Sequence, residues 1–283
     1  METGSLSAAA RRIGATQPTV GRHVAALETA LGADLFTRSP GGLTPTEAAL
    51  ALKPHVEDMA AAAEALVRTA SGDAASETGV IRLTASDIVG AEVLPPLIAA
   101  FRERHPGIVI ELVLSNRQED LLRREADIAV RMARPSQAAL VARRVGQVPV
   151  NLYAHRRYLA AHGTPEGFRD LSGHTLIGFD RDASVIEALQ ATGIDMSREL
   201  FSIRTDSDLA QLALLRSGAG VSACQPMLAG PDLVRILPDD FHFDLEVWVA
   251  MHEDLRATRR MRLMFDFLVE GLKDYVARSR LAP

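Results

Sequence analysis

The stretch GATQPTVGRHVAALE, residues 14–28, decides how the N-terminal part of this chain folds. Its apolar residues, together with Leu31 just beyond it, recur at spacings of four, three and four, which is the period of one helix face. The residues on this face are Val20, Val24, Leu27 and Leu31. We expect them to form core and the polar residues between them to face outward.

A shorter helix precedes this one. In SLSAAARRI, Ser7 is the predicted N-cap, and Gly14 interrupts the helical pattern before the next helix. Thr16 is the predicted cap of that next helix, and Pro18 falls in its first turn, where a missing N–H costs little. The longer helix should therefore begin near Gln17. Two helices joined by about three residues predict a helix-turn-helix.

The polar residues of the second helix predict a surface that contacts DNA. In a helix-turn-helix, the N-terminal residues of the second helix enter the major groove. Here those residues are Gln17, Pro18, Thr19, Arg22 and His23. Gln pairs with adenine, Arg pairs with guanine or a phosphate, and a helix N-terminus favours an anion. The alternative is an ordinary helical hairpin whose polar face is only solvated.

A tight turn follows in LGADLFTRSPGGLT, residues 31–44, where Pro40, Gly41 and Gly42 stand together. We interpret it as the wing of a winged helix-turn-helix, with Arg38 reaching the DNA backbone or the minor groove. A loop arginine that is merely solvated is the alternative.

A long helix is predicted over residues 45–70. Thr44, Pro45 and Glu47 have the pattern of a capping box with proline at the first helical position. The apolar residues that follow alternate spacings of four and three, which is the heptad pattern of a coiled coil. They are Leu52, Val56, Met59, Ala63 and Leu66. We expect this face to meet a second copy of the chain, although Pro54 should kink the helix. A helix packed on its own chain is the alternative.

Composition and charge limit the class of protein. The chain has 283 residues, of which 47% are hydrophobic, and its length favours two domains. Cys224 is the single cysteine, which excludes an intramolecular disulfide and a CxxC metal site. The net charge of −5 divides into +1 for residues 1–44 and −6 for the rest, so it permits a DNA-binding head without requiring one. Because no apolar run suits a membrane span or a signal peptide, we expect a cytoplasmic protein with no membrane partner.

The sequence changes character after SGDAASETG, residues 71–79, a small, polar stretch that predicts a linker between domains. Beyond it, short β-branched runs such as VIRLTA and IVIELVL alternate with helical patterns such as LPPLIAAFRERH and RQEDLLRR. This alternation predicts an α/β domain with a mostly parallel sheet. Asp206 is the predicted N-cap of a helix in TDSDLAQLALLRSG, and a last helix is predicted near residues 258–277.

Together these segments resemble the LysR-type transcriptional regulators over essentially the whole chain. The head carries most of the resemblance, because many residues match the family's helix-turn-helix signature: Ala8, Ala9, Ala10, Gln17, Pro18, Val20, Leu27, Glu28, Leu31, Gly32, Leu35, Phe36, Arg38, Leu43 and Thr44. The runs ADIAVRM and LLRSGAGVSACQP are similar to looser motifs of the family's body.

The resemblance implies four parts along the chain. They are an all-α winged helix-turn-helix head at 1–44, a dimerising linker helix at 45–70, a hinge linker at 71–79 and an effector-binding domain at 80–283. The last part would be a two-lobed α/β domain like the type 2 periplasmic binding proteins. One lobe would comprise about 80–150 with 252–283, and the other about 151–251.

Two features depart from the family pattern. Gly21 stands where the family usually has serine, which removes a phosphate contact and adds a helix-breaking preference of about 1 kcal/mol. The family's first helix precedes the GSLS motif, whereas here Gly4 is the fourth residue. Either the start is assigned too late or this is an N-terminally short copy that lacks the first helix. Val20, Val24 and Leu27 would then lack part of their cover, and DNA binding would be weakened.

A two-lobed α/β body binds small molecules between its lobes, at strand ends and helix N-termini. The candidate effector-binding residues follow predicted strands: Ser86, Asp87, Asn116, Met132, Phe179, Thr205 and Asp206. By resemblance, Ser86 matches a position that carries Ser or Thr facing the effector, and its hydroxyl would suit a carboxylate. Asp87 beside it disfavours an anion. A cap or a solvated turn is the alternative role for each residue.

The resemblance implies a transcriptional regulator that binds double-stranded DNA at an operator near its own or a divergent gene. A small-molecule effector would change the angle between the lobes and thereby DNA binding or bending. Further expected partners are a second copy, in a dimer or tetramer, and RNA polymerase; no cofactor, metal or catalytic residue is expected. A solute-binding protein and an α/β enzyme are the alternatives. The sequence offers no export signal for the first and no GxSxG, HExxH or complete dinucleotide motif for the second.

Overall fold

The computed structural model describes residues 1, 3–39, 42–70, 75–116, 126–135, 140–182 and 197–281. The chain folds as two compact units, Met1–Leu66 and Val67–Pro283, and each unit is described by itself. The predicted helix in RQEDLLRR and the turn at Pro40 and Gly41 lie outside the described residues.

The first unit begins with the two predicted helices, α1 (Leu6–Arg12) and α2 (Gln17–Leu31). Thr16 caps α2 as predicted, because its hydroxyl accepts a backbone N–H from the first turn. The predicted cap of α1 is wrong. Ser5 is the cap, because its hydroxyl accepts a backbone N–H of the first turn while Ser7 already lies inside the helix.

The apolar face of α2 is buried at one end only. Val20 is 9% exposed, whereas Leu27 and Leu31 are 45% and 47% exposed. The prediction that the whole face is core is therefore wrong for its C-terminal half. The side chain of Leu6 on α1 reaches α2 at Gly21, near Val20, and no described part of this unit covers Leu27.

The predicted wing is an antiparallel hairpin of β1 (Phe36–Ser39) and β2 (Gly42–Pro45). Helix α3 follows over Glu47–Ala70. Its cap is Thr46, whose hydroxyl accepts a backbone N–H from the first turn. The predicted cap, Thr44, is wrong because Thr44 still pairs with β1, so the helix begins two residues later than the capping-box pattern indicated.

The second unit is an α/β body. Its elements are β3 (Gly79–Ala85), the π-helix η1 (Val89–Val93), α4 (Leu94–Arg104), β4 (Ile108–Leu114), β5 (Ile128–Arg131), β6 (Leu140–His155), α5 (Arg156–His162), η3 (Phe168–Gly173), β7 (Ile177–Gly178), η4 (Arg198–Leu200), β8 (Ile203–Arg204), α7 (Asp208–Arg216), β9 (Val221–Cys224), α8 (Pro226–Ala229), β10 (Leu233–Ile236), β11 (His242–His252), η5 (Glu253–Ala257) and α9 (Arg259–Leu281). The last helix buries the predicted apolar face, which includes Met261, Met264, Phe265, Leu268 and Leu272.

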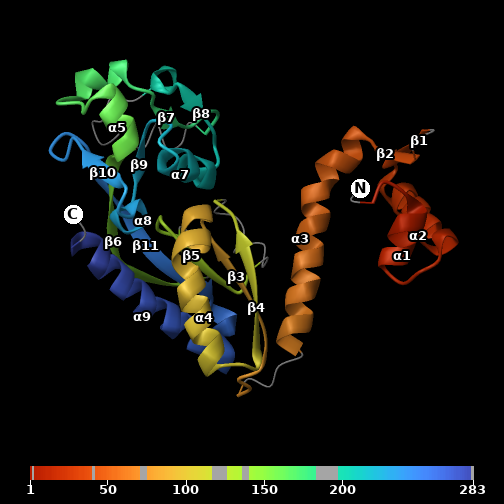
Figure 1. The fold of residues 1–283 in the computed structure, drawn as a ribbon. Helices are drawn as coiled ribbons and strands as arrows, with labels where there is room; N and C mark the ends of the chain where they lie inside the picture. Colours follow the sequence, from red (N-terminus) through yellow and green to blue (C-terminus); the bar gives the residue numbers. More distant parts are fainter. Residues whose placement is uncertain are drawn as a thin grey trace. The chain divides into compact units, whose positions relative to one another are not determined.

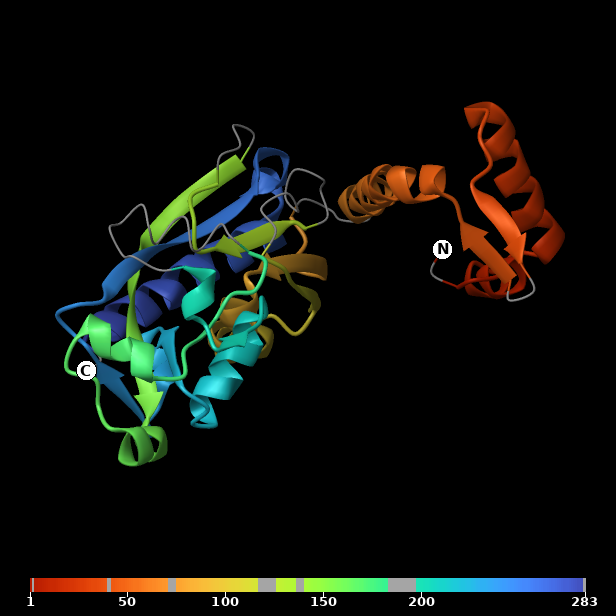
Figure 2. The same cartoon turned by 90° about the horizontal axis from the view of Figure 1, so that it is seen from above.

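Seven strands of this body form one sheet in the order β10-β6-β11-β5-β3-β4, and β9 pairs with β6. In the described part of the sheet, β3 pairs in parallel with β4 and β5, while the other four pairings are antiparallel. The prediction of a mostly parallel sheet is therefore wrong. The chain runs along the body on β6 and returns on the neighbouring β11, and strands that run out and back must pair antiparallel (Figures 1 and 2).

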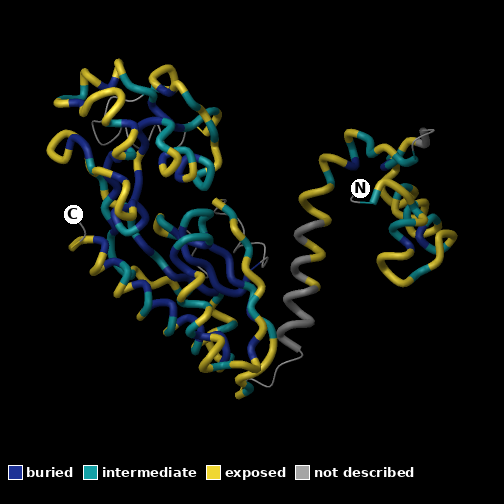
Figure 3. Tube along the Cα trace, viewed as in Figure 1, coloured by how far each residue is buried: buried dark blue, intermediate teal, exposed yellow. Residues whose placement is uncertain are grey.

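Two hydrophobic clusters divide the body into two lobes. The larger cluster includes Phe101 of α4, the strand residue Ile128 and Leu268 of α9. The smaller one includes Leu171 and Phe201, which lie beyond the end of β6 in the other lobe. Strand β6 contributes residues to both clusters, so β6 and β11 connect the lobes. In Figure 3 the central strand β5 is buried throughout, whereas β6 is buried mainly in its second half.

Candidate functional site

The first turns of α2 present most of the predicted DNA-contact residues to the outside. The exposed ones are Gln17, Pro18, Arg22 and His23. Thr19 is half-buried, and its hydroxyl lies 2.8 Å from that of Thr16. The side chain of Arg38 lies outside the described residues. Backbone N–H groups at the start of the helix have no partner within the helix, so this end can bind a phosphate while the side chains reach base edges.

Glu28 joins the end of α2 to the start of the hairpin. Its Oε1 atom accepts the backbone N–H of Leu35 at 2.8 Å and that of Phe36 at 3.2 Å. Leu35 is 6% exposed, so the loop between α2 and β1 is fixed by both a buried side chain and a carboxylate. Glu28 belongs to the family signature, but residue spacing alone does not reveal this contact.

A cavity of about 400 Å³ lies in the body, and residues of both lobes line it. Its walls are largely apolar and carry four aromatic rings, from Phe179, Phe201, Phe241 and Phe243. The volume falls within the range of small-molecule sites in proteins, roughly 300–1,000 Å³. The cavity can therefore enclose a small organic molecule.

The structure brings five of the seven predicted effector-binding residues to this cavity: Ser86, Asn116, Met132, Phe179 and Asp206. Asp87 and Thr205 are not among the lining residues. Asp87 donates its backbone N–H to Asn116 Oδ1 at 3.0 Å, and the Thr205 hydroxyl accepts a backbone N–H at 3.2 Å. Both residues therefore form hydrogen bonds next to the cavity and do not line it.

Asp206 does not cap a helix, so that prediction is wrong. Ser207 caps α7, and Asp206 instead closes the loop after β7. Its carboxylate accepts the backbone N–H groups of Asp180, Arg181 and Asp182 at 2.8 to 3.1 Å. These hydrogen bonds, led by the one from Asp182, hold the pKa of Asp206 below its usual value. The same loop carries Phe179, which is therefore positioned at the cavity.

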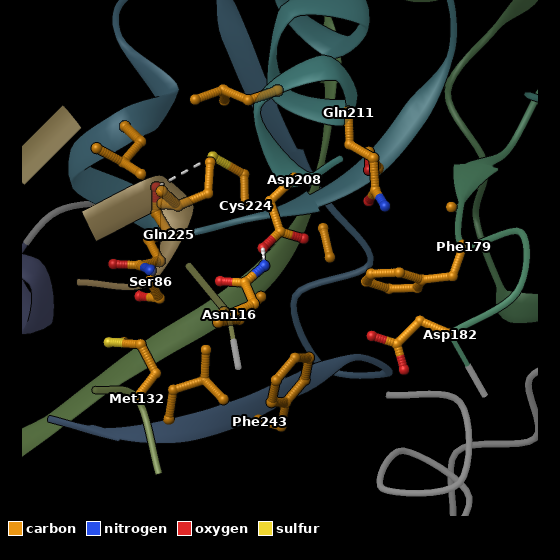
Figure 4. Close-up of a pocket in the computed structure, with 18 of the residues that line it drawn as sticks. Ser86, Asn116, Met132, Phe179, Asp182, Asp208, Gln211, Cys224, Gln225 and Phe243 are labelled. Atoms are coloured by element: carbon orange, nitrogen blue, oxygen red, sulfur yellow. Dashed lines mark hydrogen bonds between the residues drawn. The ribbon is translucent and has the colours of Figure 1, made fainter. Parts of the chain in front are cut away.

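Asp208, the first residue of α7, is a cavity residue that sequence reasoning missed. Its Oδ2 atom accepts the Nδ2–H of Asn116 at 2.9 Å (Figure 4). Burial raises the pKa of Asp208, the hydrogen bond from Asn116 lowers it, and the charges of Asp87 and Asp182 raise it further. In TDSD the sequence contains two aspartates, Asp206 and Asp208, and spacing alone could not show which of them would be desolvated.

A second polar contact also holds α7. Arg216 on α7 donates to both carboxylate oxygens of Glu92, at 3.1 and 2.8 Å, and to the carbonyl of Leu228 at 3.0 Å. The hydrogen bond with Glu92 raises the pKa of Arg216, so the guanidinium stays charged. Asn116–Asp208 and Glu92–Arg216 therefore join α7 to the segment after β4 and to η1.

Cys224 also lines the cavity, but it is a poor nucleophile. Its side chain is buried, and burial raises the pKa of its thiol to about 12. Within the described residues, no group of three His, Cys, Asp or Glu side chains is placed to hold a metal ion. Nor does the described part of the chain contain a helix that combines the length and apolarity needed to cross a membrane.

Comparison with known proteins gives the family. A model described as "LysR substrate binding domain" matches residues 74–273, and one described as "Bacterial regulatory helix-turn-helix protein, lysR family" matches residues 1–50. The chain belongs to the LysR family of transcriptional regulators. LysR-type regulators bind DNA and small-molecule effectors and form oligomers, and they are not enzymes.

Similar proteins support the same assignment over nearly the whole chain. The HTH-type transcriptional regulator CrgA of Neisseria meningitidis is 29% identical, over 96% of this chain and 93% of its own length. A probable HTH-type regulator, LtrA of Klebsiella pneumoniae, is 27% identical over 95% of this chain and 91% of its own. The solved structure of CrgA has a TM-score of 0.62 and covers 96% of this chain and 95% of that chain. Full-length AphB of Vibrio cholerae, 24% identical with a TM-score of 0.60 over 95% and 94%, shows the same fold.

Proposed function

We propose that this LysR-type regulator contacts its operator with the first turns of α2 and responds to a small molecule in the cavity of its body. The observation that carries the proposal is the cavity of about 400 Å³, which both lobes line. The pairs Asn116–Asp208 and Glu92–Arg216 join α7 to the segment after β4 and to η1 beside it. A ligand that binds between these contacts favours one arrangement of the lobes over another, which changes DNA binding or bending.

We assign residues 1–44 to the DNA-binding head, 45–70 to a dimerising linker, 71–79 to a hinge and 80–283 to the effector-binding domain. The linker assignment is supported by α3, where Val56 is 53% and Met59 is 73% exposed. A second copy would remove this apolar face from water.

In this proposal a dimer, or a tetramer of two dimers, brings two heads to one operator near its own or a divergent gene. RNA polymerase bound beside the operator is the further partner, and the site of action is the cytoplasm, where the DNA lies.

The test is binding of the full chain to the DNA upstream of its own gene over a series of salt concentrations. The log of the affinity should fall linearly with the log of the salt concentration. Arg22→Ala should weaken the complex and reduce the slope by about 0.9 for each phosphate that is no longer neutralised. Arg278→Ala, on the exposed end of α9, is the matched control and should leave affinity and slope unchanged. Equal behaviour of the two variants would show that α2 does not contact the DNA.

A further inference from the structure

The cavity combines largely apolar walls with several carboxylates. Phe179, Phe201, Phe241 and Phe243 supply aromatic walls, and Leu152 and Leu176 add aliphatic surface. Three carboxylates, those of Asp182, Asp206 and Asp208, also line the space. A ligand that fits must therefore match aromatic walls and carboxylates at the same time.

The three carboxylates differ in what they already bind. Asp206 is satisfied by the backbone N–H groups of its own loop. Asp208 receives a single hydrogen bond, at Oδ2, from Asn116. The orientation of the Asn116 amide is fixed, because its Oδ1 accepts the backbone N–H of Asp87. Oδ1 of Asp208 accepts no hydrogen bond from the described residues and is left for a ligand.

The surroundings of Asp208 favour a positive ligand. Burial raises its pKa, the hydrogen bond from Asn116 opposes this, and the charges of Asp87 and Asp182 act in the same direction as burial. Within the described residues Asp208 forms no ion pair with a Lys or Arg side chain. Binding an ammonium group would relieve both effects, because an opposite charge stabilises a desolvated carboxylate.

The two arginines that line the cavity are held by other contacts. Arg131 is buried and donates to the hydroxyl of Thr84 and the carbonyl of Val130. The guanidinium of Arg134 lies over the ring of Trp248, 5.8 Å from its centroid. Neither contact places a guanidinium group against the carboxylate of Asp208.

Ser86 supplies a second acceptor. Its Oγ atom is buried and has no hydrogen-bond partner in the described structure, and the residue lines the cavity. A buried hydroxyl without a partner costs free energy, which a ligand N–H would recover. An ammonium group has three N–H donors, so it can donate to Asp208 and to a further acceptor of the cavity.

We propose that the effector of this cavity is a compact apolar, preferably aromatic, molecule that carries a protonated amine, with the amine bound at the Asp208 carboxylate. This inference rests on the proposed function only in taking the cavity as the effector site. It runs against the carboxylate ligand that the hydroxyl of Ser86 suggests when the sequence is read alone. A carboxylate would be placed beside the carboxylates of Asp182, Asp206 and Asp208, whose like charge disfavours it.

The test uses matched probes that differ in charge. The full chain is titrated calorimetrically with 2-phenylethylamine, 2-phenylethanol and 3-phenylpropionate, and then with tryptamine and indole-3-propionate. The amines should bind on the order of 100-fold more tightly than the carboxylates, with the alcohol between them. Equal or tighter binding of the carboxylates would overturn the proposal. So would the absence of binding by either amine up to about 10 mM.

Variants then locate the amine. Asp208→Asn keeps the size of the side chain and its place at the start of α7 but removes the charge, and it should weaken amine binding on the order of 30-fold. Asp239→Asn, at an exposed turn of the same lobe, is the matched control and should bind as the wild type does. A folded Asp208→Asn variant with wild-type amine affinity would overturn the assignment. If that variant does not fold, the comparison of amine, alcohol and carboxylate probes on the wild-type chain tests the proposal by itself.

The same protein preparation is assayed for operator binding with and without the amines. If the amines fail but specific DNA binding persists, this inference is wrong and the proposed function stands. If no specific DNA complex forms while the amines bind, the proposed function fails and the ligand assignment stands.

Discussion

Replacing Gly220 with alanine should destabilise the body strongly, because the backbone of a neighbouring segment leaves no room for a Cβ atom. A Cβ at Gly220 would lie 2.2 Å from the carbonyl oxygen of Thr175. The obstacle is backbone and cannot rotate away, so β9 must move by roughly 1 Å to reach an ordinary contact distance. That movement strains the hydrogen bond from Val221 N–H to the same oxygen, which is 2.8 Å long.

The expected magnitude follows from two terms. A disrupted hydrogen bond at a buried donor costs about 1–3 kcal/mol, and overpacking costs about 1–3 kcal/mol. The loss of freedom that alanine imposes on the unfolded chain opposes this by about 0.4–1 kcal/mol. The net expectation is a loss of about 1–5 kcal/mol in the free energy of unfolding.

The assay is urea unfolding of the full chain followed by circular dichroism. Gly173→Ala is the matched control, since a Cβ there meets nothing within 4 Å, and it should change stability by less than about 0.5 kcal/mol. Because β9 carries Ser222 and Cys224 at the cavity, Gly220→Ala should also weaken ligand binding. If Gly220→Ala costs less than about 1 kcal/mol, the steric argument is refuted.

Three further predictions concern Glu28, Cys224 and Met59. Glu28→Ala should destabilise the head by about 1–3 kcal/mol, because the N–H groups of Leu35 and Phe36 lose their acceptor. Glu28→Gln keeps an acceptor, so it should lower the stability of the head less than Glu28→Ala does in a thermal melt. Cys224 should react with iodoacetamide at pH 8 at least about 1,000-fold more slowly in the folded protein than in urea, because burial raises the pKa of its thiol to about 12. The raised pKa also means that the free energy of unfolding falls as the pH rises from about 9 towards 12. Rapid labelling of the folded chain would contradict both statements. Met59→Asp should shift the protein towards monomer in analytical ultracentrifugation, because a charge would enter the proposed α3 interface, and an unchanged oligomer would place the interface elsewhere.

The head shows what a local pattern can predict. Thr16, Pro18 and the 3.6-residue period are sufficient to begin α2 at Gln17, and the proline and glycines of SPGG predicted the hairpin whose strands β1 and β2 the structure contains. Local patterns failed where a tertiary contact competed with them. Thr44 matched a capping box, but its pairing with β1 moved the cap to Thr46.

The cavity shows the opposite case. The rule that ligands bind at strand ends led to Ser86, Asn116, Met132, Phe179 and Asp206, which line the space. It could not find Asp208 or the other three aromatic rings, those of Phe201, Phe241 and Phe243, because these residues meet only when β6 and β11 join the lobes.

The sequence by itself determined the family, the helix-turn-helix, the long helix after it and the α/β character of the body, because each depends on periodicity and on residues close together in the chain. The tertiary structure alone decided the mixed sheet, the burial of α2 at one end only and the charge of the cavity. The pKa of Asp208 depends on Asp87, Asn116 and Asp182, and the 92 residues that separate Asn116 from Asp208 carry no sign of their meeting. Desolvation and charge are properties of neighbours in space, and the order of residues along the chain does not specify those neighbours.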